Sequence, residues 1–263
     1  MRKYLYIYKS EVISSLSYVL NIVIGIFSYL LLIFIFFNLW NYIYSDSSDT
    51  INGYTIGDMI WYISITEILW SVAGGRKFCR KICDDVRSGN ITYNINKPYS
   101  YIGYLLSSHL GEVTIKFIIY FISAIIVGFI FVGSFPEITA LSIIGTIISM
   151  ILAIIINSLF IIFIGLVSFY IEDANPLYWL YSKFLLVVGT LFPIEIFPEG
   201  IQGFLKLSPI YVITYGPAKL FVDFSVEKFL NIIIAQIIYI GISFGLCKIL
   251  YKKGVRKLNV NGG

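Results

Sequence analysis

The sequence has few charged residues for its length. Aspartate, glutamate, lysine and arginine make up 13% of its 263 residues, whereas hydrophobic residues make up 58%. A water-soluble domain of this size needs about a quarter charged residues to cover its surface. The composition therefore excludes an ordinary soluble globular protein.

Reaction centres are also missing. The only histidine, His109, falls in or beside a basic loop of the topology predicted below, so we expect no buried Ser–His pair. The sequence contains no His-Glu-x-x-His motif and no Gly-x-x-x-x-Gly-Lys-Ser/Thr phosphate loop. Cys79 and Cys83 lack a third and fourth ligand nearby, and three cysteines in all suggest no disulfide framework. We predict no active site, metal or cofactor in this chain.

Long uncharged runs are present instead. Residues 21–40 and 139–171 contain no charged side chain. About 20 apolar residues cross a hydrocarbon core as a helix, whereas a barrel strand is about 10 residues long and alternates in polarity. The sequence predicts an all-α integral membrane fold with six transmembrane helices. We place the spans at residues 18–42, 56–75, 112–133, 140–169, 176–193 and 229–250.

The first 17 residues mix aromatic, charged and serine residues ahead of the first span. This composition predicts an N-terminal interfacial helix over residues 1–17. The alternative is an N-terminal extension of the first span.

Lysine and arginine gather in three segments, which sets the predicted orientation. The N-terminus, residues 76–97 and the C-terminal end hold 14 of the 19 basic residues. The first intervening loop carries Asp46 and Asp49, and the second carries only Glu137. By the positive-inside rule, we predict a multi-pass protein of the cytoplasmic membrane with both termini and the 76–111 loop in the cytoplasm.

The stretch 193–228 is rich in both proline and apolar residues. Prolines prevent a continuous spanning helix, and a freely solvated loop would not be so apolar. We therefore predict an external segment of short re-entrant helices packed on protein. The prolines on which this depends are Pro193, Pro198, Pro209 and Pro217.

Charged residues in or near the predicted spans are candidates for a substrate route, because charge is costly in lipid. Glu67 lies about halfway along the second span and either forms a structural hydrogen bond or lines the route. Lys116 is a candidate partner across the bundle, or it pairs with Glu112 four residues earlier. In the last span, the spacing of Gly241 and Gly245 predicts close helix packing.

The 76–111 loop combines a basic part with a short amphipathic element. We predict a membrane-surface anchor on anionic headgroups in the residues Arg76, Lys77, Arg80 and Lys81. Gly89 is expected to end a short helix. Residues 90–96 alternate apolar with polar, which is expected to expose Ile91 and Tyr93. This favours a docking surface over an ordinary solvated loop.

In the order of these parts the chain resembles a permease subunit of the ABC-2 type of ATP-binding-cassette transporter. Residues 84–91 and 94–98 stand where that family has an acidic residue, a Ser/Thr/Gly turn, an apolar strip and a proline. Residues 111–112 resemble the start of its third span, and 207–209 with 215–216 resemble its external segment. The loop is similar to that of the branch in which two related permeases work with one ATPase type.

The resemblance implies one transmembrane domain over residues 1–263, with a cytoplasmic coupling helix that receives an ABC ATPase dimer. ATP and Mg would be bound on that separate subunit. The other partners implied are the lipid membrane and a second permease chain, forming a heterodimer rather than a homodimer, with no nucleic acid. The residues assigned to coupling are Asp84, Asp85, Val86, Arg87, Ser88, Gly89, Ile91, Tyr93, Lys97 and Pro98.

The function predicted in this way is that of the permease subunit of an ATP-driven exporter. It would move an amphiphilic peptide, drug or lipid out of the cell. The alternative is a membrane-embedded interaction or immunity protein without transport activity. A secondary transporter is a third hypothesis, and it requires inverted repeats or more intramembrane charge than Glu67 provides.

Overall fold

The computed structural model describes residues 2–45, 50–72, 74–95, 97–136, 139–171 and 173–261. Over these residues the chain is helical, and the one strand-like pairing is an isolated bridge between Ile51 and Tyr54. The predicted all-α class is confirmed. Asp46, Asp49 and Glu137, which entered the prediction of orientation, lie outside the described residues.

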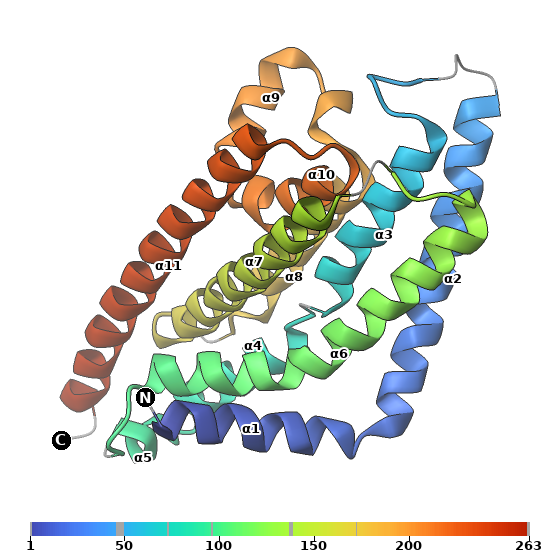
Figure 1. Cartoon of the computed structure of the whole chain (residues 1–263). Helices are drawn as coiled ribbons and strands as arrows, with labels where there is room; N and C mark the ends of the chain where they lie inside the picture. The colour runs from blue at the N-terminus through green and yellow to red at the C-terminus, as the bar shows by residue number, and fades with distance from the viewer. Residues whose placement is uncertain are drawn as a thin grey trace.

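Among the described residues, four helices are long and apolar enough to cross a membrane. They are α2 (Val19–Ser45), α6 (Tyr101–Val132), α7 (Ala140–Leu166), which continues into the 3-10 turn η1 (Val167–Phe169), and α11 (Val226–Asn261). Figure 1 shows α2 and α11 on opposite sides of the molecule, with α7 between them. These helices establish a membrane fold, and the count of six crossings stays a prediction.

Two shorter helices stand where further spans were predicted. α3 (Ile56–Val72) has 17 residues, and α8 (Asn175–Phe184) continues directly into the π-helix η2 (Leu185–Leu191). The neighbours of α3 include α2, α6, α7 and α10 (Gly216–Val222). Twelve of its 17 residues are buried, so α3 forms the centre of the bundle.

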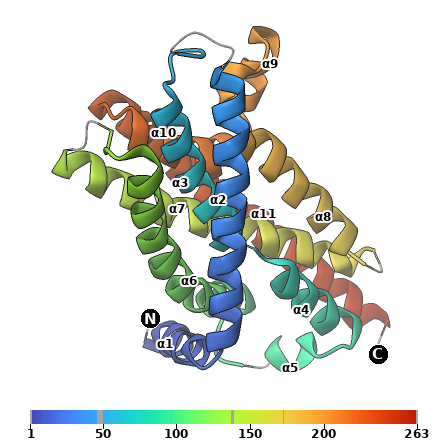
Figure 2. The same cartoon turned by 90° about the vertical axis from the view of Figure 1, so that its right-hand side faces the viewer.

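The N-terminal helix lies across one end of the bundle. α1 (Arg2–Leu16) runs beside the first half of α6, and the chain then turns sharply into α2 (Figures 1 and 2). Ser108 donates a hydrogen bond to Glu11 at 2.8 Å, and the hydroxyls of Tyr8 and Thr114 lie 3.0 Å apart. No residue of α1 is buried, as suits a helix at a membrane surface. α1 is therefore separate from α2.

The helix of the predicted third span begins about ten residues earlier than expected. It was placed from residue 112, but α6 begins at Tyr101, where the Ser100 side chain accepts a hydrogen bond from the backbone N–H of Gly103 at 3.4 Å. A serine N-cap is a common helix start.

Residues 101–111 are helical and packed on protein. Ser108 bonds to Glu11 of α1. His109 is buried, with its Nδ1 2.9 Å from the Ser158 hydroxyl of α7. The expectation that the chain offers no buried Ser–His pair is therefore wrong.

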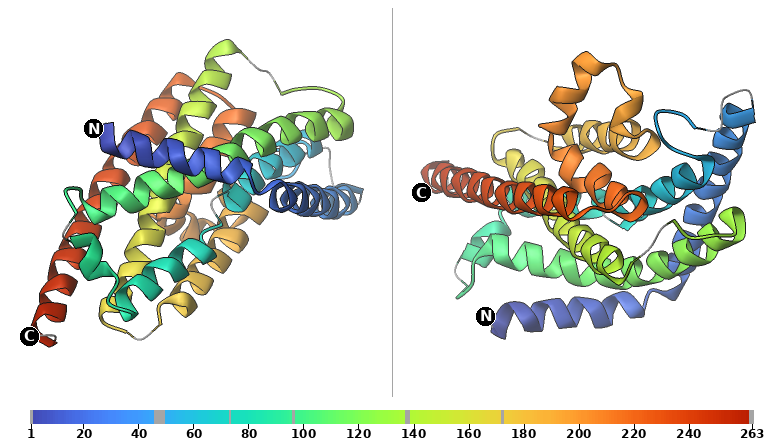
Figure 3. Two further views of the ribbon diagram at one scale, coloured as in Figure 1. Left: turned by 90° about the horizontal axis from the view of Figure 1, so that it is seen from below. Right: turned by 45° about the horizontal axis from the view of Figure 1, so that its top comes forward.

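The three basic segments meet at one end of the molecule. α1, α4 (Arg76–Arg87), α5 (Ile91–Ile95) and the end of α11 lie at the lower end in Figure 1, called the basic end below. From that end, α1 crosses beneath α6 while α4 lies next to α8 (Figure 3, left). The side of a membrane that the basic end faces stays a prediction.

Residues 193–222 form short helices at the opposite end. After η2 come η3 (Ile194–Ile196), α9 (Glu199–Lys206), the π-helix η4 (Tyr211–Tyr215) and α10. Pro193 and Pro198 directly precede η3 and α9, Pro209 precedes η4, and Pro217 lies in the first turn of α10. α10 packs against α3 and α7 and is largely buried. The prolines thus divide this segment into packed pieces.

Gly128 of α6 lies in close contact with α3. A Cβ at this position would lie 2.3 Å from the Trp61 ring. At Gly241 and Gly245 of α11, no described atom lies within 4 Å of the equivalent point, so the close packing predicted there is wrong. Spacing alone does not identify which small residue faces a large partner.

We predict that Gly128→Val lowers the free energy of unfolding by about 1–3 kcal/mol, because the valine overpacks against Trp61. Gly241→Val is the matched control and should change stability by less than about 0.5 kcal/mol. Thermal unfolding of the purified chain in detergent measures both. Equal shifts for the two variants would contradict the contact between α6 and α3.

Candidate functional site

α4 is an amphipathic helix at the basic end. Its buried face packs on α7, where Gly165 leaves room for Ile82, and consists of Phe78, Cys79, Ile82, Cys83 and Val86. The predicted anchor residues, Arg76, Lys77, Arg80 and Lys81, are all exposed. The cysteines are free thiols, and the described part of the chain holds no cluster of His, Cys, Asp or Glu suited to a metal.

A tight turn joins α4 to α5. Ser88 caps α4, and Gly89 adopts a left-handed conformation with φ of 76°. Glycine takes this conformation without the steric cost that a side chain carries. The Gly89 N–H donates to the Val86 carbonyl, and the Gly89 carbonyl accepts from Thr92. Gly89 ends the helix, as the sequence predicted.

The predicted coupling residues fall into an exposed and a buried group. Tyr93 is 70% exposed, whereas Ile91 is fully buried. The expectation that Ile91 offers an apolar docking surface is therefore wrong. The alternation of residues 90–96 indicated a strand-like period, but residues 91–95 form a helical turn that directs Ile91 into the core. Asn96 lies outside the described residues.

The remaining coupling residues surround this turn. Those exposed to solvent are Asp84, Arg87, Ser88 and Pro98. Val86 is buried beneath them, and Asp85 accepts a hydrogen bond from the Tyr101 hydroxyl at 2.9 Å. The Lys97 ammonium lies 4.3 Å from the centre of the Tyr93 ring. The solvent-exposed surface around Tyr93 therefore carries both acidic and basic side chains.

α1 holds the segment that leads from α5 into α6. Lys3 donates a hydrogen bond to the Pro98 carbonyl, and the Ser100 N–H donates to the Tyr4 hydroxyl at 2.9 Å. A Cβ at Gly103 would lie 2.8 Å from the Tyr4 ring, so the two helices are in close contact. Any displacement of the 97–100 segment therefore acts on α1.

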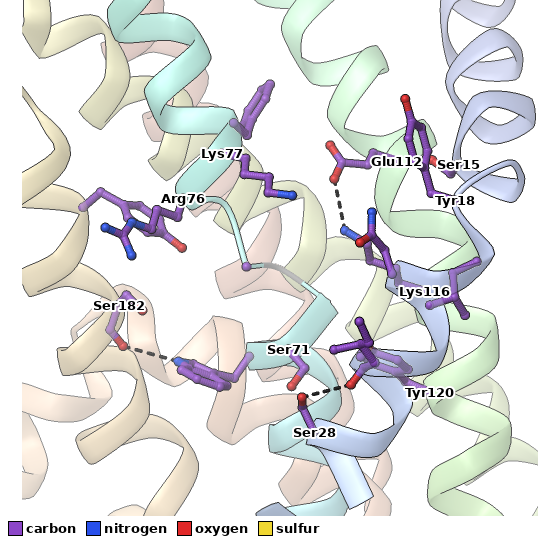
Figure 4. A pocket seen from close by; sticks show the side chains of 18 of the residues that line it. Ser15, Tyr18, Ser28, Ser71, Arg76, Lys77, Glu112, Lys116, Tyr120 and Ser182 are labelled. Atoms are coloured by element: carbon purple, nitrogen blue, oxygen red, sulfur yellow. Dashed lines mark hydrogen bonds and ion pairs between the residues drawn. The ribbon is translucent and has the colours of Figure 1, made fainter.

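A groove of about 890 Å³ opens beside α4, between α2, α6 and α8. Figure 4 shows Tyr18 and Ser28 on the side of α2, Tyr120 on α6, Ser71 beside Ser28, and Ser182 across from them. Sites for drug-sized molecules have volumes of roughly 300–1,000 Å³. The groove is therefore large enough for such a ligand.

Charged side chains gather where the groove meets the basic end. Lys116 pairs with Glu112 at 3.0 Å, so of the two arrangements that the sequence left open, the pair within one helix is the one formed. Hydrogen bonds from the backbone and side chain of Asn175 lower the pKa of Asp173, which keeps that carboxylate ionised. Arg76 and Lys77 also line the groove. The two carboxylates in the described lining, Glu112 and Asp173, therefore each have a partner within the chain.

Lys183 also lines the groove, and the sequence analysis did not single it out. It lies in the last turn of α8, inside the predicted fifth span at 176–193. A lysine inside an apolar span was the signal that could have identified it, because such residues usually face protein or water rather than lipid. The structure brings Lys183 into one groove with Arg76, Lys77 and Lys116.

Glu67 lies behind the groove wall and does not line the groove. It is fully buried, and its Oε1 accepts a hydrogen bond from Ser71 at 2.8 Å. Its Oε2 has no hydrogen-bond partner among the described residues. Lys116 is not its partner. Of the two predicted roles, the structure shows the hydrogen bond, and its donor Ser71 lines the groove.

A polar cluster joins three segments at the opposite end of the molecule. Glu195 accepts hydrogen bonds from Tyr54 at 3.1 Å and from Tyr215, and Lys219 lies 3.6 Å from it. Lys219 also donates to the Tyr54 hydroxyl at 2.9 Å. Burial, and then the charge of Glu195, raise the pKa of Tyr54, so the phenol keeps its proton. No pattern in the sequence indicated this cluster, because its members are up to 165 residues apart.

The long apolar helices, the basic amphipathic α4 with its glycine turn, and the broken helices at the opposite end occur together in one chain. A family model described as "ABC-2 family transporter protein" matches residues 12–262. The chain belongs to the ABC-2 transporter family. A comparison with curated proteins gave no match.

As a member of the ABC-2 family, the chain is a permease, a membrane transport subunit without catalytic activity of its own. Its family implies association with an ABC ATPase and with a membrane. The match confirms the resemblance drawn from the sequence. The residues assigned to coupling, to the membrane anchor and to the external segment stay predictions.

We predict that Lys219→Met lowers the free energy of unfolding by about 1–3 kcal/mol, because it leaves the largely buried Glu195 without its cation. Lys206→Met on α9 is the matched control, since Lys206 is exposed and has no ion pair within the described residues. Thermal unfolding in detergent compares them. A loss no greater than that of Lys206→Met would show that the polar cluster does not hold this end together.

Proposed function

We propose that this chain is one of two permeases in an ATP-driven exporter, with α4 and α5 as the docking site of a cytoplasmic ABC ATPase dimer. The observation that carries the proposal is the exposed, mixed-charge turn between α4 and α5, which lies at the basic end on the helix whose first turn lines the groove. In this proposal the basic end faces the cytoplasm, and ATP and Mg²⁺ are bound on the ATPase.

The chain would cross the membrane six times, with α3 and the continuous α8–η2 as the two shorter spans. A helix of 17 residues is about 25 Å long, at the lower end of what a crossing needs. The enclosure of α3 supports this assignment, because a helix surrounded by protein does not itself have to match the lipid thickness.

The contacts around α4 and α5 support a mechanical route from the ATPase to the groove. α4 packs on α7 and α8, and the segment after α5 is hydrogen-bonded to α1 through Lys3 and Tyr4. α1 leads directly into α2, which forms one wall of the groove. Closure of an ATPase dimer against α5 would therefore shift α1 and α2 relative to α8.

A second permease would enclose the groove from the side of α2 and α8. α2 exposes a row of large apolar side chains, including Leu20, Ile24, Phe27 and Leu31. Such a surface suits either lipid or an apolar partner. We propose a related second chain as that partner, on the basis of the resemblance of the loop to paired permeases, and an amphiphilic substrate moved outward between the two.

We predict that the double variant Arg87→Glu/Tyr93→Ala weakens association with the ATPase by about tenfold or more, because it reverses a charge and removes an exposed aromatic anchor. Lys252→Glu, on the exposed end of α11, is the matched control and should leave association unchanged. A pull-down in mild detergent, with mass spectrometry of the captured subunits, provides the measurement.

Stimulation of ATP hydrolysis by the permease gives a second measurement, because coupling depends on the same contact. The double variant should fold normally, since Arg87 and Tyr93 are exposed and not part of the core. Isolation of the chain without any ATPase under gentle conditions, or full stimulation by the double variant, would contradict the proposed docking site.

A further inference from the structure

We propose that the groove binds an anionic amphiphile, with its acidic headgroup between Arg76, Lys77 and Lys183 and its hydrocarbon chain against α2 and α6. This inference rests on the proposed function, because it names the chemical class of the molecule that the permease would take from the membrane. The ligand class is a lipid-like molecule with a phosphate or carboxylate headgroup.

The charge balance of the groove is the first argument. Its described lining includes four cations and two carboxylates. Glu112 is paired with Lys116, and Asp173 is hydrogen-bonded by Asn175. The remaining cations are Arg76, Lys77 and Lys183, and none of them has an ion pair within the described residues. An excess of uncompensated positive charge favours an anionic ligand.

The position of these cations is the second argument. They come from two different elements, the first turn of α4 and the last turn of α8, and both meet at the same groove. Figure 4 shows Lys77 extending from α4 toward the side of α6, where Lys116 faces it. In the same view Arg76 extends the other way, toward the side of α8. Cations from separate helices that line one groove can contact one phosphate or carboxylate through several charge-assisted hydrogen bonds.

The location of Lys183 sets this site apart from an ordinary basic membrane surface. Arg76 and Lys77 stand in a segment where the positive-inside rule already predicts cations. Lys183 instead lies within the predicted fifth span, where a lysine is costly unless it faces water or a counter-charge. The groove gives Lys183 access to water, and a bound anion would supply its counter-charge.

The walls of the groove account for the hydrocarbon part of the ligand. The lining also includes Ile22 and Ile24 of α2, Ile115 of α6, Trp70 of α3 and Trp179 of α8. A small soluble anion would leave these side chains uncovered. A cationic amphiphile would fit the aromatic residues but would meet three unpaired positive charges at the basic end. An anionic amphiphile is complementary to both parts.

The test is a binding measurement on the purified chain in phosphatidylcholine nanodiscs. The probes are short-chain fluorescent phosphatidylglycerol and the equally long phosphatidylcholine. The triple variant Arg76→Gln/Lys77→Gln/Lys183→Gln should bind the phosphatidylglycerol probe about tenfold or more weakly than the natural chain, with little change for phosphatidylcholine.

Lys252→Gln/Lys253→Gln/Arg256→Gln is the matched control. It removes the same charge from exposed positions at the same end of the molecule, on α11. It should change phosphatidylglycerol binding by less than about twofold if the groove is the site. Arg76→Lys/Lys77→Arg/Lys183→Arg keeps the charge and should retain binding, which separates loss of charge from loss of folding.

Three results would overturn the inference. Equal losses in the two charge-removing triple variants would indicate non-specific attraction to the basic end. Equal binding of the two probes by the natural chain would show that headgroup charge is not selected. Complete displacement by millimolar inorganic phosphate would indicate an anion site that makes no use of the apolar walls. The measurement needs no ATPase, so its failure is distinct from failure to couple to one.

Discussion

The enclosure of α3 is the constraint on which the rest of the structure depends. An enclosed helix needs its polar groups satisfied mainly by protein. Its neighbours meet most of this demand through hydrogen bonds such as those from Tyr29 to the Ser64 carbonyl and from Thr66 to the Thr190 carbonyl, although Oε2 of Glu67 has no partner among the described residues. The same enclosure brings Trp61 into close contact with Gly128 and places a carbonyl of the π-helix η2 within reach of Thr66.

Both ends of this central helix lead to polar structures. Before α3, Tyr54 belongs to the cluster with Glu195 and Lys219. After it, Gly75 precedes α4, and the N–H of Gly75 donates to the Tyr178 hydroxyl of α8 at 2.8 Å. In the proposed mechanism, a displacement of α4 would reach the opposite end of the molecule along α3. This gives the permease a physical connection between its basic end and the helices around α9 and α10.

The sequence was informative wherever one local property determines structure, and it failed where a distant contact does. Gly89 could be predicted as a helix end because its left-handed conformation is a local requirement. The start of α6 at Tyr101 was missed because distant segments cover the polar side chains there, Glu11 of α1 at Ser108 and Ser158 of α7 at His109. Ile91 was misplaced because a five-residue element is too short to distinguish helical from strand-like periodicity. Apart from Lys183, no feature of the sequence indicated the groove.

Lys183 also decides how the groove should be understood. The basic residues at 76–81 have a sufficient explanation in membrane topology, and alone they would not indicate a ligand. Lys183 has no such explanation, because a topological signal belongs in a loop and this lysine lies inside an apolar segment. If α8 spans the membrane as proposed, the groove gives this lysine a way out of the lipid. Arg76 and Lys77 line the same groove, so the proposed acidic headgroup would compensate charges that topology explains and one that it does not.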